Sequence, residues 1–152
     1  MGTMSSAPPL PSEAPHLVEM LVVRAGGRLA ALRLRDVIET LRPLPLAAAP
    51  GAPPFVRGVA VVRGAAVPVV SLARLLGGDD APGTRWVALR GSRALEVDEV
   101  LGFRELPAAA LGEAPALLGP ALRDHAEALA VLDGQLLAVL DAARLLDTEA
   151  GT

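Results

Sequence analysis

The sequence predicts a mainly β protein in which two similar small subdomains carry short helices. Hydrophobic residues make up 52% of the 152-residue chain and charged residues only 20%, so one globular domain with a sizeable core is expected. Short aliphatic stretches separated by glycine-containing turns recur along the chain, which is the pattern of β-hairpins. One hairpin and the short helix after it occur twice, which indicates two copies of one unit.

The first hairpin is expected close to the start of the chain. Residues 17–23 are apolar and β-branched enough for a strand, Ala25-Gly26-Gly27 is a turn signal, and residues 28–34 suit the return strand. Residues 35–41 are short and mixed, and predict either a brief helix or a bend. Residues 43–54 contain too many prolines for a helix or a central strand.

The second hairpin is followed by a capped helix. Residues 59–62 and 67–70 predict two strands that are joined by a turn at Arg63-Gly64. Ser71 stands where a helix N-cap belongs, and residues 72–76 predict a short helix that two glycines end.

A third hairpin is predicted from strands at residues 85–89 and 93–97, with the turn at Gly91-Ser92. Residues 100–105 are expected to extend this hairpin. Residues 107–121 are rich in alanine, leucine and proline, and predict one or two short helical turns in an irregular connection.

The last hairpin has the same order of strand, turn, strand and capped helix as the second. Its strands are predicted at residues 129–132 and 136–140, around a turn at Asp133-Gly134. Asp141 is a second helix N-cap, placed before a short helix at residues 142–146.

The resemblance between these two hairpins is an internal repeat. Residues 59–76 align with residues 129–146 without a gap, and eight of the eighteen positions are identical. The two capping residues occupy the same position of the alignment. A weaker similarity relates residues 35–38, before the first copy, to residues 98–101, before the second. The chain therefore reads as two units of hairpin, connection, hairpin and capped helix, which predicts two like subdomains with a groove between them.

The hairpin turn is where the two copies differ. Asp133-Gly134 suits a two-residue turn that needs positive φ angles, whereas arginine is a poor choice for the backbone that Arg63-Gly64 would adopt. A local rule that one copy breaks and the other keeps indicates a functional position. The alternative is a solvated arginine in a slightly different turn.

Several classes of function are disfavoured by residues that the sequence lacks. It contains no cysteine and no lysine, which excludes thiol nucleophiles, zinc–thiolate sites, Schiff bases and a phosphate-binding lysine. Its two histidines, His16 and His125, are far apart, and the net charge is −3. A hydrolase or transferase is one rival interpretation, and a small-barrel nucleic-acid binder is another, but the latter needs basic grooves and stacking aromatics. No catalytic residue, cofactor or metal ligand is predicted.

The ends of the chain are expected to lie outside the fold. Residues 1–15 are rich in alanine, proline and serine and predict a disordered tail, in which Met4 is a candidate natural start after a short cloning scar. Residues 16–148 are expected to form the single domain, and residues 149–152 a second tail. No signal peptide or membrane-spanning run is expected, which predicts a cytoplasmic protein.

Several motifs resemble the family of CheW-like chemotaxis coupling proteins. The most specific is the run at residues 50–59, Pro-Gly-Ala-Pro-Pro-Phe-Val-Arg-Gly-Val, followed by Val-Arg-Gly at 62–64 and Val-Pro-Val-Val at 67–70. Val-Ile-Glu at residues 37–39 is similar to the family's Val-x-Glu segment, and Val-Asp-Glu-Val at residues 97–100 to its Val-Asp-x-Val hairpin. The resemblance extends from residue 17 to residue 146, where the closing hairpin and helix end.

The resemblance implies a fold of two interlocked five-stranded β-barrels. It also implies a non-enzymatic adaptor that couples chemoreceptor tips to a CheA-type histidine kinase. The helical hairpin of the methyl-accepting receptor would pack into the groove between the barrels, and the regulatory domain of the kinase would dock on a barrel surface. Mixed rings with the kinase and recruitment to membrane-associated receptor arrays are further expectations. The alternative is a scaffold of a non-flagellar pathway controlling surface motility, development or transcription.

The resemblance also selects candidate partner-binding residues. The family's conserved glutamate and arginine match Glu39 and Arg63, and such a pair can bridge the short segment to the turn. Beside them stand Thr40 and Gly64. Four apolar residues are candidates for the groove lining, with ordinary core packing as the alternative for each: Leu34, Val37, Val97 and Val100.

Two positions depart from the family pattern. Val61 replaces the usual asparagine of the turn, which removes a side chain that can hydrogen-bond there, and Ser71 replaces the usual aspartate of the cap, a conservative change.

Other chemically notable residues are predicted to have structural or solvent-exposed positions and no role in catalysis. Trp86 is expected in a barrel core and His125 on the surface or in a loop. The acid pair Asp79-Asp80 is expected to lie in a solvated loop. The pair Asp98-Glu99 is expected to be a poor general acid/base pair, because adjacent residues of a strand face opposite ways.

Overall fold

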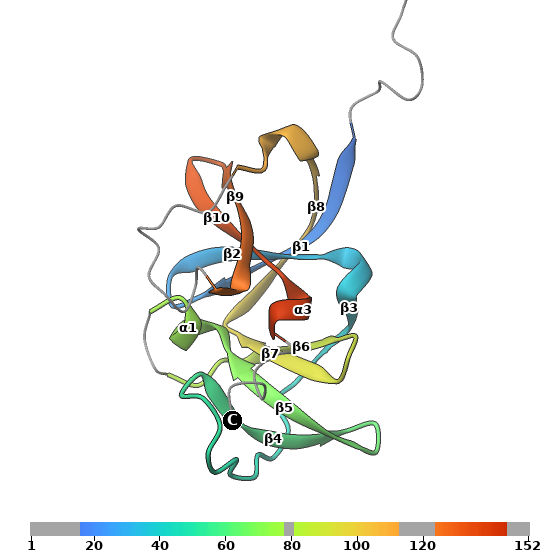
Figure 1. The fold of residues 1–152 in the computed structure, drawn as a ribbon, viewed down its shortest axis with the longest axis vertical. Coiled ribbons are helices and arrows are strands. Elements are labelled where there is room, and N and C mark those ends of the chain that lie inside the picture. Colours follow the sequence, from blue (N-terminus) through green and yellow to red (C-terminus); the bar gives the residue numbers. More distant parts are fainter. Residues whose placement is uncertain (1–15, 78–80, 113–123, 146–152) are drawn as a thin grey trace, which may run out of the picture.

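The computed structural model describes residues 16–77, 81–112 and 124–145, and its strands form two five-stranded sheets. Sheet A has the strand order β8-β1-β2-β10-β9 and lies in the upper part of Figure 1. Its strands are β1 (Leu17–Ala25), β2 (Arg28–Arg33), β8 (Glu99–Pro107), β9 (Ala126–Leu132) and β10 (Gln135–Leu140).

Sheet B has the order β3-β6-β7-β5-β4 and lies in the lower part of Figure 1. Its strands are β3 (Val37–Leu41), β4 (Val56–Val62), β5 (Ala65–Ser71), β6 (Arg85–Leu89) and β7 (Arg93–Val97). The helical segments are short: η3 (Leu34–Asp36), α1 (Leu72–Leu75), η4 (Ala108–Ala110) and α3 (Ala142–Leu145).

The two sheets are interlocked, because each combines one hairpin from one half of the chain with three strands from the other. Sheet A joins β1 and β2 to β8, β9 and β10, and sheet B joins β6 and β7 to β3, β4 and β5. We call β1–β5 with α1 the first half and β6–β10 with α3 the second half. In each sheet the two halves meet at a parallel pair, with Val139 of β10 opposite Ala31 of β2 and Val69 of β5 opposite Ala94 of β7.

The predicted internal repeat is present in the structure. Its two copies are β4-β5-α1 and β9-β10-α3, which occupy the same places in the two sheets. Each outer strand also carries an isolated bridge at the same position of the repeat, Ala47 with Val59 and Gly112 with Leu129. The mainly β fold and its two-subdomain organisation are therefore confirmed.

The hairpin turns of the two copies have the same backbone conformation. Arg63 has φ 53° and Asp133 has φ 50°, and each is followed by a glycine with φ 81°. The alternative of a different turn at Arg63 is therefore wrong. Arginine occupies a left-handed conformation that favours glycine, asparagine and aspartate, which is a local cost at this position.

The core has three parts, of which the largest is shared by both sheets. Separate clusters fill sheet A, around Met20 and Leu137, and sheet B, around Trp86 and Val69. The shared cluster contains residues of both sheets and of both α-helices. Trp86 is fully buried, which confirms its prediction as a core residue.

Both predicted helix caps are present. The Ser71 hydroxyl accepts a hydrogen bond from the Arg74 amide at 3.3 Å, and an Asp141 carboxylate oxygen accepts one from the Ala143 amide at 3.0 Å. These bonds satisfy amides that the first helical turn leaves without intrahelical partners.

Two predicted elements differ from the structure. Residues 35–41 were expected to form a brief helix or a bend, but only residues 35 and 36 are helical, as the end of η3. The chain then forms β3, which pairs antiparallel with β6. Residues 100–105 do not extend the third hairpin, because β8 leaves sheet B and pairs with β1. The edge of β7 that a continuing strand would use is occupied by β5 from the first half, so tertiary pairing overrides the local sequence.

The barrel description also needs a correction. The strand pairings of the described residues leave both sheets open, with β8 and β9 as the edges of sheet A and β3 and β4 as the edges of sheet B. The predicted tails, the acid pair Asp79-Asp80 and the helix residue Leu146 lie outside the described residues. Helical turns were expected within residues 107–121, and η4 is a turn of this kind in the described part of that range.

Candidate partner-binding groove

A groove of about 350 Å³ lies between β3 and β8, where an edge of sheet B meets an edge of sheet A. It contains five of the eight residues that the sequence nominates for partner binding: Leu34, Val37, Glu39, Thr40 and Val100. Its other lining residues are Leu21, Ile38, Leu101, Gly102 and Phe103.

The two walls of the groove are equivalent positions of the two halves. In each wall the strand register shifts by one residue, at Ile38 against β6 and at Leu101 against β1. Such a bulge leaves one residue out of the ladder and redirects its side chain. Ile38 is 51% exposed and Leu101 42%, so both bulges present an aliphatic side chain to solvent at the groove.

The walls differ in chemistry at their equivalent positions. Strand register makes Glu39 equivalent to Gly102 and Thr40 equivalent to Phe103. The wall of β3 is therefore polar at its centre, and the wall of β8 presents a phenylalanine that is 68% exposed. Phe103 was not selected from the sequence, because its place on the groove depends on the long-range pairing of β8 with β1.

Glu39 forms an ion pair with Arg63 at the rim of the groove. The Arg63 Nε donates a hydrogen bond to a Glu39 carboxylate oxygen at 2.5 Å. The Arg63 side chain is 72% exposed and the Glu39 side chain 31%. The contact joins β3 to the turn between β4 and β5. The ionised forms are favoured: the hydrogen bond from Arg63 lowers the pKa of Glu39, and Glu39 raises the pKa of Arg63.

We expect the Glu39 carboxyl to titrate below the ordinary glutamate range, and Arg63→Ala to return its pKa towards that range. Because the pKa of Glu39 is lowered in the folded state, the ion pair contributes stability above the unfolded pKa and loses it as the pH falls through the folded one. A ¹³C-detected NMR titration of the Glu39 carboxyl in both proteins measures this. A Glu39 pKa that is the same in both proteins would contradict the contact in solution.

The remaining nominated residues lie outside the groove. Val97 is 1% exposed and belongs to the shared core, so its side chain cannot be a contact surface and the core alternative holds for it. Arg63 and Gly64 are exposed in the turn and reach the groove only through the ion pair. Val61, on the strand that leads into this turn, is 67% exposed and leaves an apolar spot beside it.

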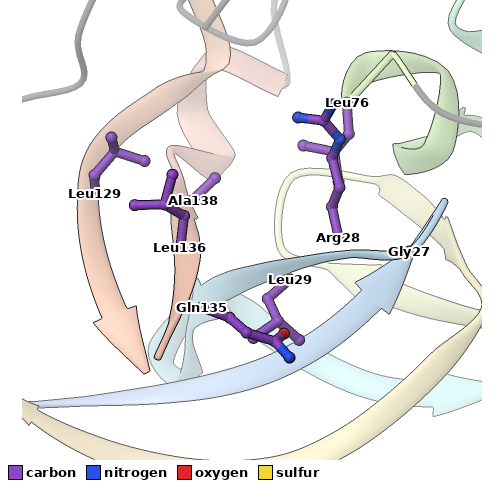
Figure 2. A pocket seen from close by; sticks show the side chains of 8 residues that line it. All are labelled: Gly27, Arg28, Leu29, Leu76, Leu129, Gln135, Leu136 and Ala138. Atoms are coloured by element: carbon purple, nitrogen blue, oxygen red, sulfur yellow. The ribbon is translucent and has the colours of Figure 1, made fainter. Parts of the chain in front are cut away.

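A second pocket, of about 320 Å³, lies between the β1–β2 turn, α1 and the β9–β10 hairpin (Figure 2). Leucines from several elements line it, and Arg28 and Gln135 are its only charged or amide side chains among the described residues. None of the nominated residues is part of it.

The other chemically notable residues have structural contacts. The His125 ring is half-buried and lies T-shaped against Phe55, with the ring centroids 5.2 Å apart, so it is less exposed than expected for a surface histidine. An Asp98 carboxylate oxygen accepts a hydrogen bond from the Gly26 amide at 2.9 Å. Within the described ranges no three histidine, cysteine or acidic side chains gather as metal ligands would. No described helix is long and apolar enough to cross a membrane.

Comparison with known proteins agrees with this architecture. Residues 19–150 match the family model of the CheW-like domain. The chain is 33% identical over 138 residues to protein FrzA of Myxococcus xanthus, which covers 86% of each chain. Its fold is similar to that of the crystallised scaffolding protein TtCheW from Thermoanaerobacter tengcongensis, with a TM-score of 0.71, 19% identity, and 83% of this chain and 90% of that one covered.

Proposed function

Since the chain belongs to the CheW-like domain family, we propose that it is a non-enzymatic adaptor that couples chemoreceptors to a CheA-type histidine kinase. In this proposal it acts in the cytoplasm and is recruited to receptor arrays. The mechanism is positional: one rigid protein holds two partners in a fixed relation, and a receptor motion changes kinase activity through that relation.

The observation that carries the receptor half of the proposal is the groove between β3 and β8. It combines exposed apolar side chains on both walls, Ile38, Leu101 and Phe103, with a polar rim at Glu39. An amphipathic helix binds to such a groove by placing apolar anchors in it, while a few polar groups select the partner. A helical hairpin from a receptor tip is an occupant of this kind.

The kinase half rests on the turn at Arg63. The turn is exposed, its arginine holds a strained conformation, and Glu39 orients the guanidinium from the neighbouring strand. A strained residue that its surroundings hold in place is typical of a functional position. The regulatory domain of the kinase is proposed to dock on this surface, with mixed rings of kinase and adaptor as the larger assembly.

Charge reversal tests the role of the Glu39–Arg63 pair. Arg63→Asp and Glu39→Arg are each expected to weaken kinase or receptor binding, because each places like charges at the rim. The double charge swap is expected to recover part of the lost affinity, since it restores opposite charges. Isothermal titration calorimetry of the four proteins gives the coupling. Strictly additive losses in the double variant would show that the pair does not act as a unit.

Phe103→Ser tests the groove itself. Phe103 is 68% exposed, so we expect its loss to leave the melting temperature almost unchanged while binding of a receptor hairpin weakens about tenfold or more, as for an aromatic anchor. Leu46→Ser is the matched control, because Leu46 is 40% exposed and lies in the proline-rich crossing away from the groove. Equal receptor affinities for the two variants would show that the receptor does not bind in this groove.

The alternative is a scaffold of a non-flagellar chemosensory pathway that controls surface motility, development or transcription. The adaptor chemistry would be the same, and only the receptor and the kinase would differ. The neighbouring genes, followed by a pull-down of the native protein, would distinguish the two pathways.

A further inference from the structure

Two ion pairs occupy equivalent places in the two sheets. In sheet B, Arg57 of β4 uses its Nη2 and Nε to bind one oxygen of Glu96 on β7, at 2.8 and 3.0 Å. In sheet A, Arg33 of β2 uses the same two nitrogens to bind one oxygen of Glu127 on β9, both at 2.6 Å. Each pair spans the strand between its partners, β5 in sheet B and β10 in sheet A.

The equivalence is fixed by strand register and by bulges. Arg57 and Glu127 are 70 positions apart, the offset of the repeat, and each is the residue at which its outer strand shifts register against β5 or β10. A bulge takes a residue out of the ladder, which frees its side chain to reach across the next strand. Their partners, Glu96 and Arg33, also hold equivalent positions. Glu96 lies two residues after Ala94, which is opposite Val69 in sheet B. Arg33 lies two residues after Ala31, which is opposite Val139 in sheet A.

The signs of the charges are inverted between the two pairs. Both arginines, Arg33 and Arg57, belong to the first half, and both glutamates, Glu96 and Glu127, belong to the second half. Every contact between the halves at these positions is therefore attractive. If each half closed on itself, so that β2 paired with β5 and β7 with β10 in the same register, Arg33 would face Arg57 and Glu96 would face Glu127.

We propose that these two inverted ion pairs select the interlocked pairing of the halves and disfavour closure of each half on itself. The aliphatic strands discriminate poorly, because β5 is rich in valine, β10 is rich in leucine, and each follows the same type of turn. Opposed like charges, in contrast, penalise the self-closed arrangement in both halves at once. This inference is independent of the proposed adaptor function, since it concerns only how the chain reaches its fold.

The test changes the charges of sheet A, where the Arg33 and Glu127 side chains are 25% and 24% exposed and substitutions have room. The double charge swap Arg33→Glu with Glu127→Arg keeps an attractive pair in the native fold. It also makes the self-closed arrangement attractive, because the carboxylate introduced at position 33 would face Arg57 and the guanidinium introduced at position 127 would face Glu96. The matched control, Arg33→Gln with Glu127→Gln, removes both the native pair and the repulsion.

Engineered cysteines report which strands pair, and the chain contains no cysteine of its own. Ala31→Cys with Val139→Cys places thiols on opposed residues of the native sheet A, within the reach of a disulfide. Ala31→Cys with Val69→Cys reports the self-closed arrangement, because Val69 holds the place of Val139 in the first half and lies in the separate core of sheet B. Each full-length protein is refolded from urea under oxidising conditions, and intramolecular cross-links are resolved on non-reducing gels.

The expected result is a self-closed cross-link that is absent with native charges, detectable in the glutamine variant and strongest in the charge-swapped variant. Two results would overturn the proposal. One is absence of the self-closed cross-link from the charge-swapped variant while its native cross-link forms fully. The other is appearance of the self-closed cross-link in the glutamine variant alone, because the ion pair would then only stabilise sheet A.

Discussion

Replacing Arg57 with methionine is expected to lower the free energy of unfolding by about 3–5 kcal/mol, the usual cost of removing one partner of a buried ion pair. The Glu96 side chain is 5% exposed and that of Arg57 14%, so the carboxylate that remains has little access to water. Methionine keeps much of the arginine stem, and the loss therefore reports mainly the charge. Urea unfolding followed by circular dichroism measures it.

The equivalent pair in sheet A is the matched control for this prediction. Arg33→Met removes the same type of contact, but its partner Glu127 is 24% exposed and regains water, so a loss of about 1 kcal/mol is expected. Similar losses for Arg57→Met and Arg33→Met would show that burial does not decide the cost. Replacing Arg57 and Glu96 together with methionine and leucine should recover most of the stability, because no charge remains in the interior.

Trp86→Ala is expected to destabilise the protein by about 3–5 kcal/mol, the range for removing a large aromatic side chain from a core. Trp86 is fully buried in the cluster that fills sheet B, among small residues such as Ala60 and Ala94, which cannot expand into the space left behind. Far-UV circular dichroism must follow the unfolding, because this is the only tryptophan of the chain.

Trp86→Phe separates packing from hydrogen bonding at this position. The Trp86 Nε1 makes no hydrogen bond to any described residue, so phenylalanine loses volume but no polar contact. We expect it to cost less than half of the alanine loss. A phenylalanine variant as unstable as the alanine variant would mean that the indole nitrogen has a partner in solution.

Much of the fold could be predicted from the sequence because it is decided locally. The turns at Arg63-Gly64 and Asp133-Gly134 follow from short-range backbone preference, and the caps at Ser71 and Asp141 from a side chain that reaches an amide two or three residues away. The repeat revealed the equivalence of the two halves. The Glu39–Arg63 contact was expected from the family resemblance, and the ion pair of the structure agrees with it.

The sites that depend on long-range pairing could not be predicted in the same way. Val97 and Val100 are three residues apart and equally apolar, yet Val97 is buried in the shared core and Val100 lines the groove. Their difference arises where the chain leaves sheet B for sheet A. Phe103 was missed for the same reason, since its exposure depends on which strand β8 joins.

The sequence by itself therefore determined the hairpins, the capped helices, the duplicated plan and the absence of the residues that many kinds of enzyme chemistry need. Only the tertiary structure decided which half of the chain supplies each strand, where the bulges at Ile38, Arg57, Leu101 and Glu127 fall, and which residues form the walls of the groove. The physical reason is that turns and caps depend on neighbours in the chain, whereas strand exchange depends on contacts between residues far apart in sequence.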